Sequence, residues 1–326
     1  MAANLKRFLN IFPSTPSYAF AYGSRVKAQA NIAESVGDMI DLVVVVDDPL
    51  SFHKNNIEKN PSHYSFLRHF GHRVVSSIQE KTGARIYYNS LVPVDGHVIK
   101  YGIIGTDHLI NDLLDWETLY VSGRLHKPVE VLQEPNMESL TKALDMNYKN
   151  ALHTALLLLD ETFTEEELYL TISSLSYSGD FRMIIGEDKN KVANIVKPQV
   201  ESFRKIYIPY VTSDTMSGLV QWHPLTKSFS QSYSNKVFLH HLNLLPKQVQ
   251  QRLYINWTKN GASRDLDDVL LSISQSYGLP NHVRKAVQQI VFRSSLTQSA
   301  KGVLTAGVVK STKYSARKLR KMWNSL

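Results

Sequence analysis

The apolar run at residues 39–46 constrains the fold of this chain more than any other segment. Its sequence, MIDLVVVV, is strongly β-branched, and Asp47-Asp48-Pro49 stops it, so we expect a buried β-strand here. Three further strands are expected, at residues 18–21, 85–92 and 97–104. The last two are joined across a turn signal at Asp95-Gly96. Helical patterns separate these segments, at residues 66–80 and 109–120, so the fold class is a mixed α/β (α+β) one.

The character of the sequence changes after Lys127-Pro128. A long helix is expected at residues 137–159, and a capping box at Thr164 to Glu167 opens another helix that runs to about residue 175. A further helix is expected from Pro198 to about residue 206, whereas residues 225–262 give no clear pattern. We therefore divide the chain near residue 130. The expected parts are a candidate targeting segment at 1–16, a first domain at 17–130, a mostly helical domain at 131–224 and a C-terminal region at 225–326.

Basic residues gather at the C-terminal end of the chain. The formal net charge is +8, and ten lysines and arginines follow Asp268, the last acidic residue. The preceding part is therefore close to neutral, and we expect the residues after Asp268 to form a cationic arm. Such an asymmetry indicates an anionic partner, either nucleic acid or lipid.

The last turns of this tail, which covers about residues 300–326, favour lipid over nucleic acid. Apolar residues at i, i+3, i+4 and i+7 form one stripe: Leu319, Met322, Trp323 and Leu326. The basic residues fall largely outside that stripe: Lys313, Arg317, Lys318, Arg320 and Lys321. A basic amphipathic helix with a tryptophan on its apolar face predicts peripheral binding to an anionic membrane surface. The alternative is a terminal helix that packs the stripe against the protein core.

Several classes of protein are excluded by what the sequence lacks. It contains no cysteine, which rules out disulfides, thiolate zinc sites and a cysteine nucleophile. No apolar run approaches the ~20 residues that span a bilayer, so we do not expect an integral membrane protein. Residues 1–16 carry Lys6 and Arg7 without an acid and weakly resemble a mitochondrial targeting segment.

Gly23-Ser24 follows the first expected strand and precedes a helical stretch. A glycine lets the backbone approach a phosphate, and serine and helix N-terminal amides can bind it. A plain turn is the alternative. Asp41 comes 17 residues after Ser24, at the start of the central strand, in a layout similar to that of polymerase-β-like nucleotidyltransferases. In that superfamily strand carboxylates hold Mg²⁺, but Asp41 has no acidic neighbour at two-residue spacing. We therefore expect Asp180 to be the second catalytic and metal-binding carboxylate.

A series of motifs runs through nearly the whole chain. They are Tyr22-Gly23-Ser24, Asp41 to Pro49, Asn60 to Ser65, Tyr87 to Ser90, Lys100-Tyr101-Gly102, Leu119 to Pro128, Leu175 to Arg182, Gly186 to Lys189 and Gln298 to Trp323. In this order and spacing they resemble the mitochondrial phosphatidate cytidylyltransferase family, also called translocator assembly and maintenance proteins.

The resemblance implies a fold, an activity and a location. The fold is a polymerase-β-like nucleotidyltransferase domain, then a winged-helix-like domain and a basic amphipathic C-terminal helix that binds membrane. The activity is Mg²⁺-dependent transfer of a cytidylyl group from CTP to phosphatidic acid, which gives CDP-diacylglycerol and pyrophosphate for cardiolipin synthesis. The location is the matrix face of the inner mitochondrial membrane, as a peripheral protein.

Three cations are candidate ligands of the nucleotide. Lys100 lies in the middle of an apolar strand, where an unpaired ammonium is costly to bury, so we expect it to bind a CTP phosphate. Arg124 and Lys127 flank the turn before Pro128 and are expected to bind the triphosphate or the phosphatidate headgroup; a solvated loop is the alternative. Asp180 and Arg182 are expected in a loop after a helix, where an ordinary ion pair is the alternative.

Two other functions stay open at this point. The first is a different nucleotidyltransferase that acts on RNA or on a small molecule, although we do not expect a nucleic-acid partner. The second is a non-catalytic assembly factor on the membrane, with a vestigial nucleotidyltransferase fold. The missing strand carboxylate favours this second function, and the set Gly23, Ser24, Asp41 and Lys100 argues against it.

Overall fold

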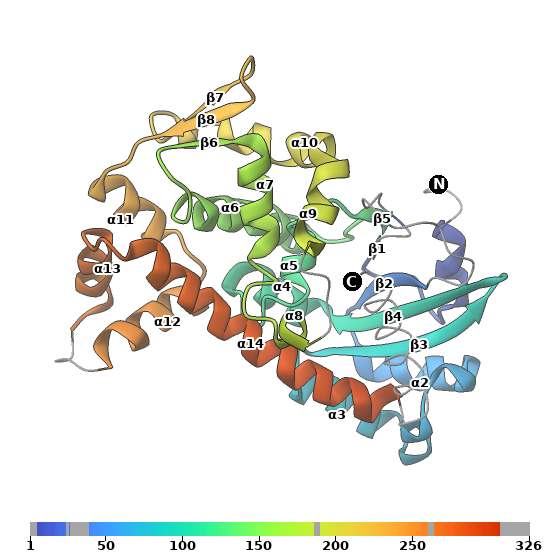
Figure 1. Ribbon diagram of the computed structural model, residues 1–326. Coiled ribbons are helices and arrows are strands. Elements are labelled where there is room, and N and C mark those ends of the chain that lie inside the picture. Colours follow the sequence, from blue (N-terminus) through green and yellow to red (C-terminus); the bar gives the residue numbers. More distant parts are fainter. Residues whose placement is uncertain (1–4, 24–25, 27–38, 186–189, 260–263, 307–326) are drawn as a thin grey trace.

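A five-stranded sheet forms one half of the computed structural model, which describes residues 5–23, 26, 39–185, 190–259 and 264–306 (Figure 1). The strand order is β3-β4-β2-β1-β5. The strands are β1 (Tyr18–Tyr22), β2 (Ile40–Val46), β3 (Ile86–Val94), β4 (His97–Gly105) and β5 (Glu130–Gln133). β2 pairs with β4 in parallel, and the other pairs are antiparallel. The four strands expected from the sequence are therefore confirmed, with β2 at the centre.

Both faces of this sheet are covered, because the side chains of β2 alternate between two cores. Leu42 and Val44 pack with Phe8 and Phe12 from η1 (Arg7–Ile11) and the chain after it, and with α2 (Pro49–Lys59). Val43 and Val45 pack on the opposite face against α4 (Thr106–Asp115) and the first turns of α6 (Glu138–Leu156). The residues assigned to a candidate targeting segment thus contribute Phe8 and Phe12 to the core, and the targeting role stays a prediction.

Two of the expected helices differ from the prediction. The segment at 66–80 is broken by Gly71, whose φ of +87° ends η3 (Phe66–Phe70) before α3 (His72–Lys81) begins; η2 (Pro61–His63) precedes them. The segment at 109–120 is helical only to Asp115, because Trp116 turns into the left-handed region with φ of 55°. A tertiary network, described below, holds the chain in a turn after that point.

The second half of the molecule is mostly helical. Its small antiparallel sheet has the order β6-β8-β7, from β6 (Thr162–Thr164), β7 (Val220–His223) and β8 (Ser228–Gln231). Helices surround it: α7 (Glu165–Ser174), α9 (Lys191–Val196), α10 (Val200–Val211), α11 (Asn235–Asn243), α12 (Lys247–Thr258) and α13 (Leu266–Ser274), with short 3₁₀ turns η4 (Lys197–Gln199) and η5 (Asp214–Met216). The capping box at Thr164 and Glu167 is confirmed. Division of the chain at residue 130 and a winged-helix-like arrangement stay predictions.

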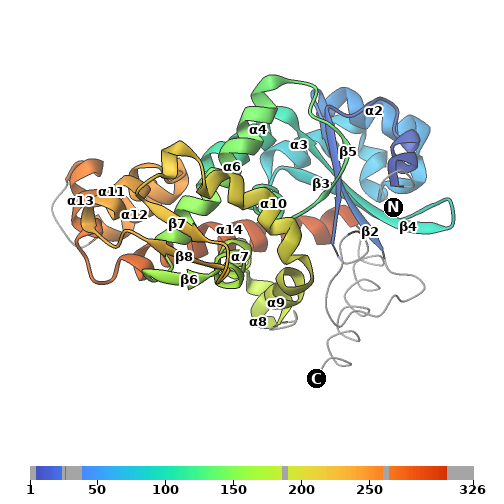
Figure 2. The ribbon, with the colours of Figure 1, turned by 90° about the horizontal axis from the view of Figure 1, so that it is seen from above.

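The last described element, α14 (Leu279–Ala306), corrects the expectation of a cationic arm after Asp268. It packs against α12 and α13 at one end and against β3 at the other, and so joins the two halves (Figures 1 and 2). Near its C-terminal end Gln298 Oε1 accepts from Ala84 N at 2.9 Å, and Lys301 Nζ donates to Gln79 O at 3.0 Å and Thr82 O at 2.9 Å. These carbonyls end α3, so Lys301 caps that helix.

The part of the basic tail after residue 306 lies outside the described residues. This applies to all nine residues assigned to membrane contact, between Lys313 and Leu326, and to Ser24. Within the described ranges, no helix has both the length and the apolar content needed for a membrane span.

Candidate functional site

The three inner strands of the large sheet bring one polar row together near the start of β2. The strand register places Asp41 of β2 opposite Tyr22 of β1 on one side and opposite Lys100 of β4 on the other. Lys100 Nζ lies 3.4 Å from Asp41 Oδ1 and 4.3 Å from the ring centroid of Tyr88. Gly23 has a φ of +90°, and a Cβ built there would lie 3.6 Å from Asp41 Oδ2. Gly23, Asp41 and Lys100, each singled out from the sequence, therefore lie together.

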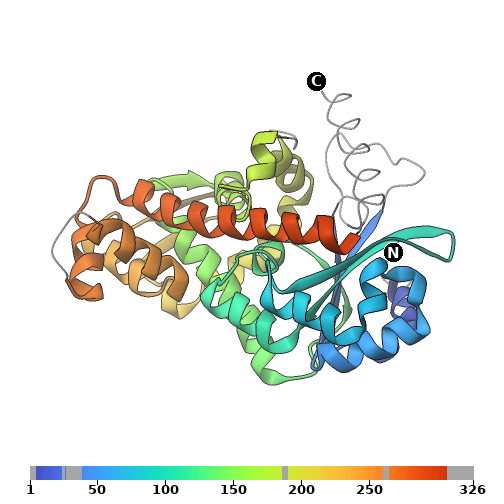
Figure 3. The same cartoon turned by 90° about the horizontal axis from the view of Figure 1, so that it is seen from below.

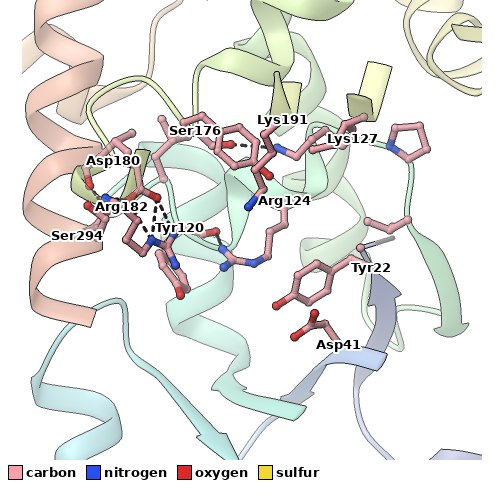
Figure 4. Close-up of a pocket in the computed structure, with 18 of the residues that line it drawn as sticks. Tyr22, Asp41, Tyr120, Arg124, Lys127, Ser176, Asp180, Arg182, Lys191 and Ser294 are labelled. Carbon is pink, nitrogen blue, oxygen red and sulfur yellow. Dashed lines mark hydrogen bonds and ion pairs between the residues drawn. The ribbon is translucent and has the colours of Figure 1, made fainter. Parts of the chain in front are cut away.

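A cavity of about 250 Å³ opens above this row (Figure 4). Its walls come from the end of β1, the start of β2, the middle of β4, the turn at residues 119–129, the loop after α7, the helices α9 and α14, and Gln199. Five cationic side chains face two carboxylates in the lining: Lys100, Arg124, Lys127, Arg182 and Lys191 against Asp41 and Asp180. A partly closed cavity with this excess of positive charge suits a polyanionic ligand such as a triphosphate.

A buried carboxylate shapes the turn that forms one wall. Asp112 of α4 accepts from Thr118 N at 2.8 Å, Leu119 N at 2.9 Å, Val121 N at 3.1 Å and Ser122 N at 2.9 Å, and from Thr118 Oγ1 at 2.7 Å. These bonds satisfy four backbone donors at once and replace the helix that the sequence pattern predicted. The turn leads into α5 (Ser122–Leu125) and places Tyr120 and Arg124 in the cavity wall.

Arg124 stacks between two tyrosines at the centre of the cavity. Its guanidinium carbon lies 4.0 Å from the ring centroid of Tyr120 and 5.2 Å from that of Tyr22, and Nη1 donates to Tyr120 O. Among the described residues, its buried Nε has no hydrogen-bond partner. Burial raises the pKa of Tyr120, but Arg124, Arg182 and Lys100 outweigh it and bring that pKa to about 8. The potential in the cavity is thus positive, with a guanidinium donor left over for a ligand.

Lys127 is almost completely buried in the same wall. Its Nζ donates to Gly123 O and, at 2.9 Å, to Ser176 Oγ, and lies 5.2 Å from the ring centroid of Tyr177. Burial first, and then the nearby charges of Arg124 and Lys191, lower the pKa of Lys127 to about 7. An anion in the cavity would favour the charged form of this ammonium.

Asp180 lies in the same cavity but is closely paired with Arg182. Both its oxygens accept from Arg182 Nε, at 3.0 and 3.1 Å, and Oδ2 also accepts from Nη2 at 2.5 Å. Its side chain is only 4% exposed. Figure 4 shows this pair beside Ser294 of α14, at the opposite end of the lining from Asp41. Gly179 allows the approach, since a Cβ there would lie 2.5 Å from Gln288 O of α14.

Comparison with known proteins gives this chain a family. The family model described as "Phosphatidate cytidylyltransferase, mitochondrial" matches residues 5–321. A Xenopus laevis protein of that name is 46% identical over 329 residues, which cover 98% of this chain and 95% of the relative. A Caenorhabditis elegans protein of the same name is 38% identical over 322 residues, which cover 98% of each chain. This chain belongs to the mitochondrial phosphatidate cytidylyltransferase family. The resemblance inferred from the motifs is therefore confirmed.

In this member of the phosphatidate cytidylyltransferase family, several lining residues could not be recognised from sequence. Lys191 opens α9, and Val291, Ser294 and Ser295 belong to α14, at least 100 residues further along the chain. No local pattern connects these positions with Gly23 or Asp41. Tyr120 and Arg182 lie within the family motifs, but their contacts with Arg124 and Asp180 depend on the tertiary fold.

A metal ion in this cavity would have Asp41 as its most accessible protein ligand. Within the described part of the chain, no group of three acidic or histidine side chains could hold a metal. Mg²⁺ in nucleotide sites commonly takes one or two carboxylates together with substrate phosphates and water. The partly exposed Asp41 fits that donor set, whereas the contacts of Asp180 with Arg182 occupy the lone pairs that a metal would use.

Proposed function

We propose that this protein transfers the cytidylyl group of CTP to phosphatidic acid, giving CDP-diacylglycerol and pyrophosphate. The observation that carries the proposal is the cationic cavity closed over Asp41 and Lys100, in a chain whose relatives are named for this activity. A phosphate oxygen of phosphatidic acid attacks the α-phosphorus of CTP. The bond from that phosphorus to the bridging oxygen breaks, and its electron pair leaves with pyrophosphate.

The chain's cations have distinct places in this reaction. Lys100, in the middle of β4, lies next to Asp41 and binds the phosphate where the bond breaks. Arg124 and Lys127 bind the rest of the triphosphate or the phosphatidate headgroup, since both line the same wall. Fixed cations around the departing pyrophosphate stabilise the charge that builds up in the transition state. Gly23 lines the cavity directly after β1. Gly23 and Ser24, the next residue in the sequence, are the candidates to receive the nucleotide.

Mg²⁺ would be held by Asp41 and by phosphate oxygens of CTP. When bound, it supplies Lewis-acid polarisation of the phosphate and neutralises the leaving group. Asp180 stays the candidate for a second ligand, which would require its contacts with Arg182 to open. In the arrangement described here, Asp180 orients Arg182 toward the cavity, and this role needs no metal.

The membrane part of the proposal concerns the tail. Phosphatidic acid keeps its acyl chains in a bilayer, so the enzyme must reach the interface. The basic amphipathic segment between Lys313 and Leu326 would bind an anionic surface peripherally. We place the protein on the matrix face of the inner mitochondrial membrane, where CDP-diacylglycerol feeds cardiolipin synthesis.

One assay separates this function from its two rivals. Pyrophosphate release from CTP is measured with Mg²⁺, with and without liposomes that contain phosphatidic acid, and with RNA as an alternative acceptor. The proposal expects release only with phosphatidic acid. Release with RNA alone would support the other nucleotidyltransferase, and no release under any condition would support the assembly factor. Asp95→Asn, in the exposed turn between β3 and β4, is the control for Asp41→Asn.

A further inference from the structure

The last turns of α14 have an inverted distribution of polarity. Their inward side is polar, and five side chains there are at most 6% exposed: Ser294, Ser295, Gln298, Lys301 and Thr305. Their outward side carries four large apolar side chains that are between 46% and 54% exposed, together with exposed Arg293 and Thr297. The four apolar residues are Phe292, Leu296, Val303 and Leu304. We call these four residues the outer face of α14. A helix on a globular protein ordinarily buries its apolar side, so this arrangement needs a partner.

We propose that the outer face of α14 rests on an anionic bilayer and that it forms, on the folded body, a membrane contact separate from the tail. The inference rests on the proposed function, because a phosphatidic acid in a bilayer is what brings the membrane to this side.

The charge of α14 favours an anionic lipid surface over the apolar surface of another protein as the partner of the outer face. Arg293 is exposed next to Phe292, Arg284 and Lys285 are exposed nearer the N-terminal end of α14, and no acidic residue follows Asp268 anywhere in the sequence. Basic residues beside half-exposed apolar side chains are the composition of an interfacial helix. Each cation close to an anionic surface adds to the attraction, and salt screens it.

The position of α14 beside the cavity also supports a bilayer against the outer face. Val291, Ser294 and Ser295 line the cavity, and Phe292 and Leu296 lie in the same turns on the outer side. A bilayer against the outer face would therefore be separated from the cavity by about one helix diameter, roughly 10 Å. Figure 3 shows α14 extended along one side of the molecule.

A second exposed apolar cluster lies in η3, directly before α3 in the chain. Phe66 and Phe70 are 52% and 64% exposed, and their rings meet edge to face at 6.2 Å. They precede α3, whose C-terminal carbonyls are bound by Lys301 of α14. Figure 1 shows α3 and the end of α14 together along the lower edge of the molecule. Arg68 and Arg73 lie beside these rings in sequence, so the cluster has the same basic and aromatic character.

The test measures membrane binding separately from catalytic activity on a soluble substrate. The full-length chain carrying Phe292→Ser and Leu296→Ser is compared with the parent by flotation with vesicles of phosphatidylcholine and phosphatidic acid. We expect vesicle affinity to fall about 10- to 30-fold, since each side chain has roughly half of its apolar surface left to bury. Pyrophosphate release with a short-chain, water-soluble phosphatidic acid should be unchanged. Leu225→Ser, in the turn between β7 and β8, is the matched control, because Leu225 is fully exposed on a different element.

Because the chain has no cysteine, a single introduced cysteine gives a second, gain-of-signal readout. Val303→Cys and Leu225→Cys are each labelled with an environment-sensitive fluorophore. Anionic vesicles should shift the emission of the label at 303 to the blue and leave the label at 225 unchanged. Equal flotation of the serine variant and no shift at 303 would overturn the proposal. A shift at 303 that follows protein concentration without vesicles would also overturn it, since it would identify a second copy as the partner. If the parent itself releases no pyrophosphate with short-chain phosphatidic acid, the proposed function is refuted instead.

Discussion

Asp112→Asn should disrupt the turn that carries Tyr120 and Arg124, although Asp112 itself does not line the cavity. One carboxylate oxygen accepts from Thr118 and Leu119, and the other accepts from Val121 N and Ser122 N. An asparagine can keep the first set, but its amide group then faces the two backbone donors of the second set. Two buried N–H groups lose their acceptor.

The magnitude follows from the cost of those two donors. A buried donor left without a partner costs about 1–3 kcal/mol, so the free energy of unfolding should fall by about 2–6 kcal/mol. Urea titration followed by tryptophan fluorescence measures this, and Trp116 reports on the turn because it is buried at its start. Asp107→Asn, an exposed residue in the first turn of the same helix, is the control and should change the free energy by less than about 0.5 kcal/mol.

The functional consequence separates positioning from simple loss of stability. At a temperature where the variant is still folded, KM for CTP should rise because Arg124 is no longer held against the rings of Tyr22 and Tyr120. A destabilised variant with unchanged KM would restrict Asp112 to a structural role. A variant destabilised by less than about 1 kcal/mol would refute the reasoning altogether, because the two donors would then have found other acceptors.

Four further outcomes are expected. Asp41→Asn should abolish pyrophosphate release in Mg²⁺ while the melting temperature stays close to that of the parent. If the variant keeps a turnover close to that of the parent, the assignment of Asp41 as a catalytic residue is refuted. Ser24→Ala and Lys100→Ala should weaken CTP binding in calorimetry more than vesicle binding, and the reverse would place them in the lipid subsite. CTP affinity should fall as pH rises from 6 to 8, because Lys127 has a pKa of about 7 and loses its charge over that range; Lys127→Met should flatten this dependence. Deletion of Lys313–Leu326 should leave CTP binding intact and reduce flotation with anionic liposomes, whereas unchanged flotation would mean that the tail packs on the protein.

The strands of the large sheet could be predicted because their sequences carry the signal locally. Residues 39–46 are apolar on both faces, as a strand covered on both sides requires, and Asp95-Gly96 marks the turn between β3 and β4. The same local reasoning placed Gly23 after the first strand, Asp41 at the start of the central strand and Lys100 in the middle of another, and the register then brought them together. Where a residue's position depends on its own strand, the sequence was sufficient; the roles of these three residues stay predictions.

The rest depended on contacts between distant segments. The helix predicted to reach Tyr120 ends early because the carboxylate of Asp112 competes for the backbone donors that follow. α14 was not recognised because its last turns bury polar side chains such as Gln298 and Lys301, which reverses the pattern of a surface helix. Those side chains find their partners in α3 and at the start of β3, more than 200 residues earlier. The α14 wall of the cavity was therefore outside the reach of sequence patterns.

The destination of the α-phosphorus of CTP tests the central claim most directly. Protein, Mg²⁺ and phosphatidic acid liposomes are incubated with CTP radiolabelled at the α-phosphorus or, in a parallel sample, at the γ-phosphorus, and the lipid and aqueous phases are separated. Cytidylyl transfer at this cavity predicts that the α-label enters the lipid phase and that the γ-label is converted from CTP to pyrophosphate in the aqueous phase. With Asp41→Asn, both labels should stay in CTP. An α-label that stays in the aqueous phase, or one that enters the lipid phase equally well with Asp41→Asn, would contradict the account.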